Sequence, residues 1–302
     1  MKTETRFSKM EKNDCTATLS VLDSFNTITG YASLITGIII LTIFPTIVFL
    51  IRRSRHNSKS IFVATKKQHV VITGGSSGIG LSIAHECLEL KQRDGKPLFS
   101  HMTLIARNRS KLEVAKKELH DQFKERNENK DCDIVIETIS ADVSDYKVIS
   151  EAIEAKWKVS DQNDTPPPTI LFNVAGTSIP CRFETSDPTI FSQLMNVNYL
   201  GSVNVTRILT PHMIRNGGGT IILTSSAAGQ VGVYGYSAYS PTKFALRGLA
   251  EVLLMELAPF DIHVQLAFPP NTDTPGFQKE NELKMEECRL MEDTAGLFQP
   301  QE

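Results

Sequence analysis

The sequence has few cysteines, and no spacing pattern links them. Its 302 residues contain five, and none forms a CxxC pair. Zinc sites and disulfide frameworks use ligands or partners at characteristic paired spacings. We therefore expect no metal site, and we expect reduced thiols, as in domains that face the cytosol.

An excess of charge of either sign is also missing. Lys and Arg number 32 against 34 Asp and Glu, which gives a formal net charge of -2. Nucleic-acid-binding domains usually carry clustered positive charge, so we expect no nucleic-acid partner. The contents of 41% hydrophobic and 22% charged residues are typical of a globular protein with a full core.

Charged residues are absent from one long stretch near the N-terminus. Residues 31–51, YASLITGIIILTIFPTIVFLI, form a run long enough to cross a bilayer as a helix. The run is too long for a signal-peptide core and is not followed by a small-residue cleavage site. No polar face interrupts it, as one would in a helix at the surface of a soluble domain.

The segment RRSR follows this run directly. Basic residues beside a membrane helix stay on the cytosolic side. We therefore predict a transmembrane signal-anchor helix over residues 28–51. A polar, flexible N-terminus over 1–27 precedes it, and a basic linker over 52–67 leads to a globular domain over 68–302.

In that domain, short apolar runs alternate with helical patterns. The predicted strands are 69–73, 101–106, 133–140, 169–174, 220–225 and 263–268. The predicted helices are 79–90, 111–126, 148–158, 188–209 and 238–257. This alternation predicts an α/β fold, a Rossmann-like doubly wound parallel sheet of about six strands with helices on both faces.

A glycine-rich segment, TGGSSGIG, joins the first strand to the first helix. Glycines permit a tight turn, and a helix N-terminus supplies N–H donors for a pyrophosphate. The spacing is GxxxGxG and not the more general GxGxxG. The cofactor-binding candidates in this segment are Gly74, Ser76, Ser77, Gly78, Ile79 and Gly80.

An acidic residue is missing where NAD-preferring sites usually place one. The second strand ends in Ala-Arg-Asn-Arg, so Arg107 occupies the position near the ribose. A guanidinium pairs well with a 2′-phosphate. We therefore expect NADPH/NADP+ as the cofactor, bound by Arg107 with help from Arg109 or Lys111.

Two further segments follow strands at their carboxyl ends, where open α/β sheets bind ligands. Asp142 and Val143 follow the third strand, and the segment NVAG, with Asn173, Ala175 and Gly176, ends the fourth. Each alone is typical of turn chemistry. In order after the glycine-rich segment, they predict a cofactor cleft.

Tyr239 and Lys243 lie four residues apart in the last predicted helix, and so on one helix face. An ammonium near a phenol lowers the pKa of the phenol, which suits Tyr239 to exchange a proton with a carbonyl or alcohol oxygen. Ser226 can bond the same substrate oxygen. Asn198 can hold a water that links Lys243 to solvent.

The order TGxxxGIG, NVAG, VN, SS and YxxxK over about residues 68–275 resembles the classical short-chain dehydrogenase/reductases. The resemblance implies an NADP-dependent oxidoreductase. It makes Asn198, Ser226, Tyr239 and Lys243 the catalytic tetrad, with Tyr239 and Lys243 also contacting the cofactor.

Longer stretches are similar to the 3-ketodihydrosphingosine reductases, above all FPPNTDTPGF. That family reduces 3-oxosphinganine with NADPH at the endoplasmic reticulum membrane, with its catalytic domain in the cytosol. The resemblance implies a long-chain sphingoid ketone substrate and contact with the bilayer, and it is compatible with a homo-oligomer. It also implies cofactor contacts from Pro269, Thr272 and Thr274, although Pro269-Pro270 stands where related reductases usually have Pro-Gly.

The resemblance leaves two alternatives. One is another lipid reductase, for steroids or retinoids. The other is a truncated, non-catalytic form that binds cofactor or partners, because the family pattern continues past Glu302 with a helix and a last strand. On that basis we expect the sixth strand to be unpaired on one side and residues 299–302 to resemble the first turn of a helix.

Overall fold

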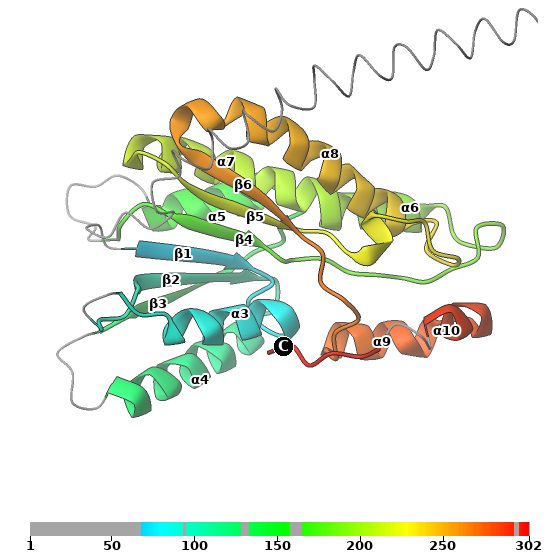
Figure 1. Ribbon diagram of the computed structural model, residues 1–302, viewed down its shortest axis with the longest axis horizontal. Coiled ribbons are helices and arrows are strands. Elements are labelled where there is room, and N and C mark those ends of the chain that lie inside the picture. The colour runs from blue at the N-terminus through cyan, green and yellow to red at the C-terminus, as the bar shows by residue number, and fades with distance from the viewer. Residues whose placement is uncertain (1–67, 93–94, 128–132, 158–164, 293–295, 302) are drawn as a thin grey trace, which may run out of the picture. The chain divides into compact units, whose positions relative to one another are not determined.

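The computed structural model describes residues 68–92, 95–127, 133–157, 165–292 and 296–301 (Figure 1). The predicted membrane helix over 28–51, with both segments flanking it, lies outside these residues and stays a prediction. Among the described residues, none of the helices has the length and apolar character needed to cross a membrane.

A parallel sheet in the order β3-β2-β1-β4-β5-β6 forms the centre of the domain. Its strands are β1 Gln68–Thr73, β2 Phe99–Ala106, β3 Val135–Ser140, β4 Ile170–Asn173, β5 Gly219–Thr224 and β6 Ile262–Ala267. All five pairings are parallel. The predicted Rossmann-like sheet of six strands is therefore confirmed.

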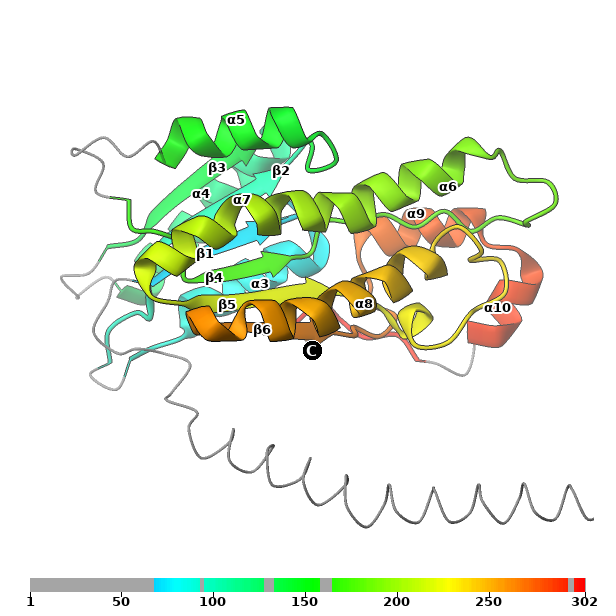
Figure 2. The ribbon, with the colours of Figure 1, turned by 90° about the horizontal axis from the view of Figure 1, so that it is seen from above.

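Helices cover both faces of this sheet (Figures 1 and 2). On one face lie α3 Gly78–Glu89 and α4 Arg109–Asn127, and on the other lie α5 Tyr146–Trp157, α7 Gly201–Asn216 and α8 Ser240–Glu256. Each face has its own apolar cluster, one around Leu104 and Leu112 and one around Leu171 and Ile221. Burial on both faces explains why the strands read as continuous apolar runs.

The predicted helix over 188–209 differs from the structure. It is divided into α6 Thr189–Leu194, a π-helical turn over Met195–Leu200, and α7. Single π-helical turns inside α-helices are frequent at functional sites. Here the turn contains the buried Asn198. A π-helical turn has one residue more than an α-helical turn, and the apolar periodicity of the sequence does not show this insertion.

Two helices stand beyond the carboxyl ends of the strands, in the segment where the sequence predicts no element. They are α9 Pro275–Leu283 and α10 Glu286–Glu292 (Figures 1 and 2). Within the described residues β6 pairs with β5 alone, as expected for the sixth strand. The expected helical turn near the end is replaced by a bridge between Phe298 and Thr272, followed by a turn.

Candidate active site

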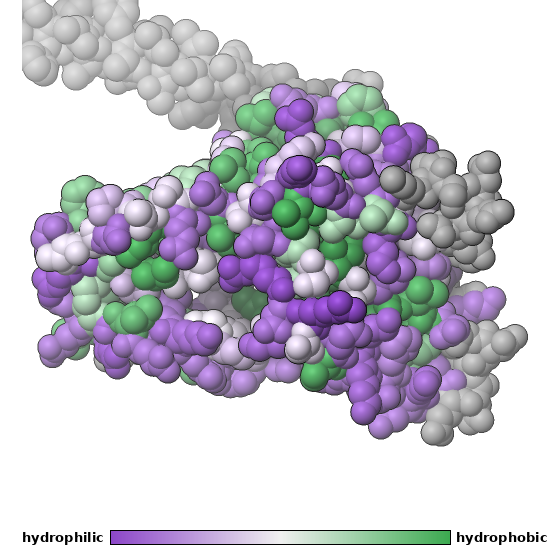
Figure 3. All heavy atoms as spheres, turned by 180° about the vertical axis from the view of Figure 1, so that it is seen from behind, coloured by the Kyte–Doolittle hydropathy of each residue, from purple (hydrophilic) through white to green (hydrophobic). Residues whose placement is uncertain are grey.

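A cavity of about 460 Å³ lies at the carboxyl ends of the central strands. The predicted site residues that line it are Ile79, Gly176, Ser226, Tyr239, Lys243, Pro269, Thr272 and Thr274. Viewed from behind, the molecule has a hollow with apolar surface at its bottom (Figure 3). Residues from five separate segments therefore meet in one cleft, as the doubly wound topology requires.

The glycine-rich loop folds back closely on itself. A Cβ atom at Gly80 would lie 2.5 Å from the carbonyl oxygen of Gly74, which itself has a φ of 72°. In the described loop, the side chain of Ser77 makes no capping hydrogen bond at the start of α3. The Ser77 side chain therefore does not occupy the first N–H groups of α3. Uncapped N–H groups at a helix N-terminus can donate hydrogen bonds to a phosphate.

Thr73, which the sequence analysis did not select, joins this loop to the segment after β4. Its hydroxyl accepts hydrogen bonds from the backbone N–H groups of Val174, at 3.0 Å, and Ala175, at 3.1 Å. The adjacent Asn173 is buried and donates to Thr206 Oγ1 at 2.9 Å. Asn173 therefore stabilises the wall of the cleft. Thr73 could have been found from the sequence, because it is a polar residue at the end of an apolar strand.

Arg107 projects from the end of β2 with a side chain that is 69% exposed. Its guanidinium is 3.7 Å from Asp142 Oδ2. Burial acts to raise the pKa of Asp142, but hydrogen bonds from Ser144 and the charge of Arg107 together lower it. Val143 is buried against Gly201, and Lys111 is exposed on α4. The exposed Arg107 is thus free of tight pairing and can receive an anion.

Tyr239 and Ser226 form the polar centre of the cavity. Tyr239 immediately precedes α8, and Ser226 precedes the short 3-10 turn Ala227–Gly229. Both side chains line the cavity, and Ser226 Oγ also accepts a hydrogen bond from the N–H of Ala228 at 3.2 Å. Burial raises the pKa of Tyr239, although the Ser226 hydroxyl acts in the opposite direction. Tyr239 therefore holds its proton firmly, as a general acid for a carbonyl oxygen must before it reacts.

Lys243 lies in the first turn of α8, with its Nζ atom 5.6 Å from the centre of the Tyr239 ring. The Nζ atom donates to the carbonyl oxygen of Thr224 at 2.9 Å. Burial lowers the pKa of Lys243 to about 8. The sequence predicts that Lys243 lowers the pKa of Tyr239, but in the structure burial of the phenol raises this pKa.

Asn198 is fully buried and holds three polar groups in place. Its Oδ1 accepts from the N–H of Thr177 at 2.8 Å, and its Nδ2 donates to the carbonyl of Thr177 at 2.9 Å and to Thr242 Oγ1 at 3.0 Å. These bonds fasten the loop after β4 to α8. The structure thus gives Asn198 a positioning role, while the water relay stays a prediction.

The segment after β6 closes the cavity from the side. Thr274 caps α9 by accepting from the N–H of Phe277 at 3.1 Å, and its side chain lies against Gly78. Thr272 is buried and donates to the carbonyl of Pro270 at 2.9 Å. Pro269, Thr272 and Thr274 therefore line the cavity, and their contacts with a cofactor stay a prediction.

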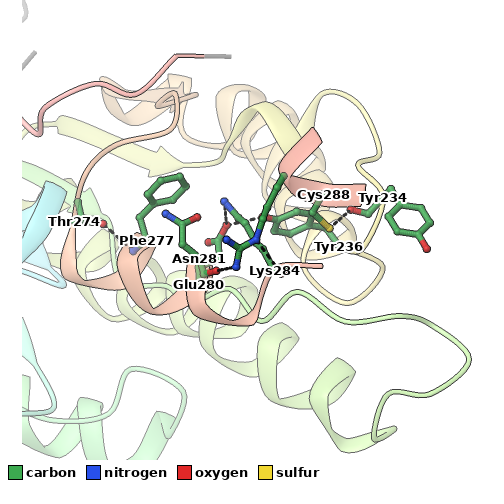
Figure 4. A network of polar contacts seen from close by, with 9 residues as sticks. Tyr234, Tyr236, Thr274, Phe277, Glu280, Asn281, Lys284 and Cys288 are labelled. Carbon is green, nitrogen blue, oxygen red and sulfur yellow. Dashed lines mark hydrogen bonds and ion pairs between the residues drawn. The ribbon is translucent and has the colours of Figure 1, made fainter. Parts of the chain in front are cut away.

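The lining residues that the sequence analysis did not select include Tyr236, Phe277 and Glu280. Tyr236 donates a 2.6 Å hydrogen bond to Glu280, and its ring centre is 5.8 Å from that of Tyr239 (Figure 4 shows Tyr236 and Glu280). Glu280 and Tyr236 are 44 residues apart in sequence. No local pattern marks them, although Tyr236 lies three residues before Tyr239.

The arrangement can transfer a proton at a cavity beside a phosphate-compatible loop. A protonated phenol next to a hydroxyl suits a carbonyl oxygen that must be bound and then protonated. The described residues contain no group of three His, Cys, Asp or Glu side chains placed to hold a metal ion. The side chains of Tyr239 and Ser226 in the cavity thus offer an acid and a hydrogen-bond donor to such an oxygen.

Known proteins of similar sequence include sphingolipid reductases. The chain is 45% identical over 235 residues to a 3-dehydrosphinganine reductase of Danio rerio and 43% identical to a 3-ketodihydrosphingosine reductase of Bos taurus. Each match covers 78% of this chain and 65% of the relative. The chain thus spans a little less than two thirds of the length of these relatives.

Solved structures of similar fold include a 3-oxoacyl-[acyl-carrier protein] reductase with bound NAD from Brucella melitensis, with a TM-score of 0.61 and 25% identity. That match covers 79% of this chain and 82% of the other. A short-chain dehydrogenase of Sphingobium yanoikuyae in complex with NADPH has a TM-score of 0.60, 23% identity and coverages of 78% and 80%. The second of these supports the fold alone.

The family model for short chain dehydrogenases matches residues 68–284. This range begins with β1 and ends just after α9. It contains the glycine-rich loop, Ser226, Tyr239 and Lys243. The chain therefore belongs to the short-chain dehydrogenase family.

Proposed function

We propose that this chain is an NADPH-dependent reductase that converts 3-oxosphinganine to sphinganine. The observation that carries the proposal is that Tyr239, Ser226 and Lys243 line one cavity beside the glycine-rich loop, with Lys243 Nζ 5.6 Å from the centre of the Tyr239 ring. The substrate follows from the relatives in Danio rerio and Bos taurus, whose names give this ketone. A reductase for a steroid or retinoid ketone is the alternative.

The residues fit the cofactor on the criteria of space and charge. The Gly74–Gly80 contact leaves room for a pyrophosphate at the start of α3, and Arg107 supplies a charge for a 2′-phosphate. When bound, NADPH supplies the hydride. Ser226 would orient the carbonyl oxygen, and Tyr239 would donate its proton to it and become a phenolate. The Lys243 ammonium would contact the ribose and hold positive charge beside that phenolate.

We also propose that residues 28–51 anchor the protein in the endoplasmic reticulum membrane, with the catalytic domain in the cytosol. The basic segment after residue 51 supports this orientation. A substrate with a long acyl chain partitions into a bilayer, so an anchored enzyme meets it there. Fusing a glycosylation acceptor to either side of the segment tests this, because only the lumenal side is modified.

The direct test is NADPH oxidation by the full chain with 3-oxosphinganine and a steroid ketone in parallel. The proposal expects turnover of the sphingoid ketone and much less of the steroid ketone. Thermal melts with and without NADPH are run on the same sample, because a ligand that binds the folded state raises Tm. A Tm shift without turnover of either ketone would favour the non-catalytic alternative, and turnover of the steroid ketone alone would replace the substrate.

The rate of ketone reduction should fall as pH rises through the pKa of Lys243. Burial lowers this pKa to about 8, so the ammonium is present below that pH and lost above it. We expect kcat/KM, which reports the free enzyme, to fall about tenfold per pH unit above this value. The assay uses a ketone without an ionisable group, so that the fall in kcat/KM at high pH reports a group of the protein.

Lys243→Arg is the comparison for this profile, because a guanidinium stays charged over the same range. Whatever activity the variant keeps should lack the limb near pH 8. A wild-type profile that stays level up to about pH 9.5, or the same limb in the arginine variant, would assign the titration to another group.

Arg107→Asp should reverse the cofactor preference. The wild-type guanidinium is expected to favour NADPH over NADH, and charge-assisted contacts of this kind contribute about 10- to 100-fold in affinity. The substitution replaces an exposed 3.7 Å contact with Asp142 by two like charges, whose repulsion is small at a solvent-exposed position, so the fold should be preserved. Titration of both cofactors measures the ratio. Arg207→Asp, at an exposed position on α7 outside the predicted site, is the matched control. An equal effect there would show that overall charge, and not Arg107, decides the preference.

A further inference from the structure

The cavity carries a carboxylate that the proton transfer does not use. Among the described residues that line it, Glu280 is the one acidic side chain. It lies on α9, and its side chain is 15% exposed. A buried carboxylate needs compensating partners, so its contacts indicate what kind of group it is placed to receive.

Glu280 is held from two sides (Figure 4). Tyr236 donates its hydroxyl proton to Oε1 at 2.6 Å, and Lys284 Nζ is 3.3 Å from the same oxygen. Neither of these two contacts involves Oε2. These two contacts fix the carboxylate in position through Oε1 alone. Because Glu280 lines the cavity, we infer that Oε2 can receive a ligand there.

The position of the Lys284 ammonium indicates that Glu280 and Phe277 can bind a cationic group. It is 2% exposed, and its Nζ lies 4.1 Å from the centre of the Phe277 ring as well as beside Glu280. Carboxylates and aromatic faces are both common partners of ammonium ions in proteins. Phe277 and Glu280 both line the cavity, so the same pair of groups is presented to a ligand there.

The carboxylate is also near the reacting position. Glu280 bonds to Tyr236, whose ring centre is 5.8 Å from that of Tyr239. The negative charge of Glu280 acts on Tyr239 and adds to the rise in its pKa. A ligand whose carbonyl oxygen reaches Tyr239 therefore places the neighbouring atoms of its chain close to Glu280.

The geometry points to Glu280 as the residue that binds the substrate ammonium and selects 2-amino ketones over ketones that lack the amine. This inference rests on the proposed function, because 3-oxosphinganine carries its amino group on the carbon next to the ketone. With Tyr239 at the carbonyl oxygen, the ammonium faces Glu280 Oε2 and the Phe277 ring. Lys284 and Tyr236 keep the carboxylate oriented and are positioning residues.

The test compares two substrates of equal chain length, 3-oxosphinganine and 1-hydroxyoctadecan-3-one, which has no amine. For the wild type we expect a lower KM with the amino ketone. Glu280→Gln keeps the size of the side chain and an acceptor for Tyr236 but removes the charge. It should lower kcat/KM for the amino ketone about 10- to 100-fold more than for the amine-free ketone, mainly through KM.

Lys284→Met is the matched control, because it breaks the same ion pair while keeping the Glu280 charge. It should keep or increase the preference for the amino ketone, since the substrate ammonium then has no competitor. An NADPH-induced Tm shift equal to that of the wild type shows that each variant is folded. If loss of the ion pair were the whole effect, both variants would lose activity on both substrates alike, and the inference would be overturned.

Failure of the inference and failure of the proposed function give different results. Turnover of 3-oxosphinganine with the same substrate ratio in wild type and Glu280→Gln would overturn the role of Glu280 alone. A wild-type protein that reduces steroid or amine-free ketones but not 3-oxosphinganine would overturn both.

Discussion

Tyr239→Phe is expected to lower kcat for ketone reduction by about 10²- to 10⁴-fold, the usual contribution of a positioned general acid. The substitution removes one hydroxyl from a residue that lines the cavity together with Ser226. The ring that packs 5.8 Å from Tyr236 is kept. Single-turnover oxidation of NADPH with 3-oxosphinganine measures the chemical step without product release.

The effect should appear in kcat and leave cofactor binding nearly as it is. Tyr146→Phe is the matched control, because Tyr146 is 49% exposed at the start of α5. It should match the wild type in both rate and Tm. If Tyr239→Phe turned over at the wild-type rate, another group would be the proton donor and the mechanism would be wrong.

Gly80→Ala is expected to weaken NADPH binding by about 10- to 100-fold, because it forces apart the loop that cradles the pyrophosphate. The added Cβ would lie 2.5 Å from the carbonyl oxygen of Gly74 and 3.1 Å from the N atom of Gly75. Both neighbours are backbone atoms and cannot rotate away. Relieving the contact moves α3 relative to β1, and we expect a loss of about 1–3 kcal/mol in stability as well.

Fluorescence titration with NADPH and a chemical denaturation curve measure the two effects. Gly248→Ala is the control, since a Cβ at Gly248, on the exposed side of α8, would meet no atom within 4 Å. Alanine in a helix interior should raise stability there by about 0.5–1 kcal/mol. Unchanged NADPH affinity in Gly80→Ala would mean that the pyrophosphate does not depend on this close approach.

Much of the fold was predictable because its signals are local. Each strand of a sheet buried on both faces is a short apolar run, and each covering helix has its own periodicity. The predicted strand over 263–268 and the observed β6 Ile262–Ala267 differ by one residue at each end. The division of the helix over 188–209 was not predictable, because the π-helical turn that contains Asn198 depends on bonds to Thr177 and Thr242.

The candidate site divides in the same way. The glycine-rich segment, Ser226, Tyr239 and Lys243 each lie at a strand end or the helix that follows, so their order in sequence predicts that they meet. The direction of the Tyr239 pKa was wrong, because a neighbouring lysine is visible in sequence and burial of the phenol is not.

The sequence by itself determined the order of strands and helices, the family resemblance and the residues that can transfer a proton. These follow from local periodicity and from the fixed edge at which parallel strands end. Only the tertiary structure decided which side chains share the cavity with them. Glu280 reaches Tyr236 across 44 residues because α9 turns back over the strand ends, and a contact formed between distant segments leaves no local pattern in the chain.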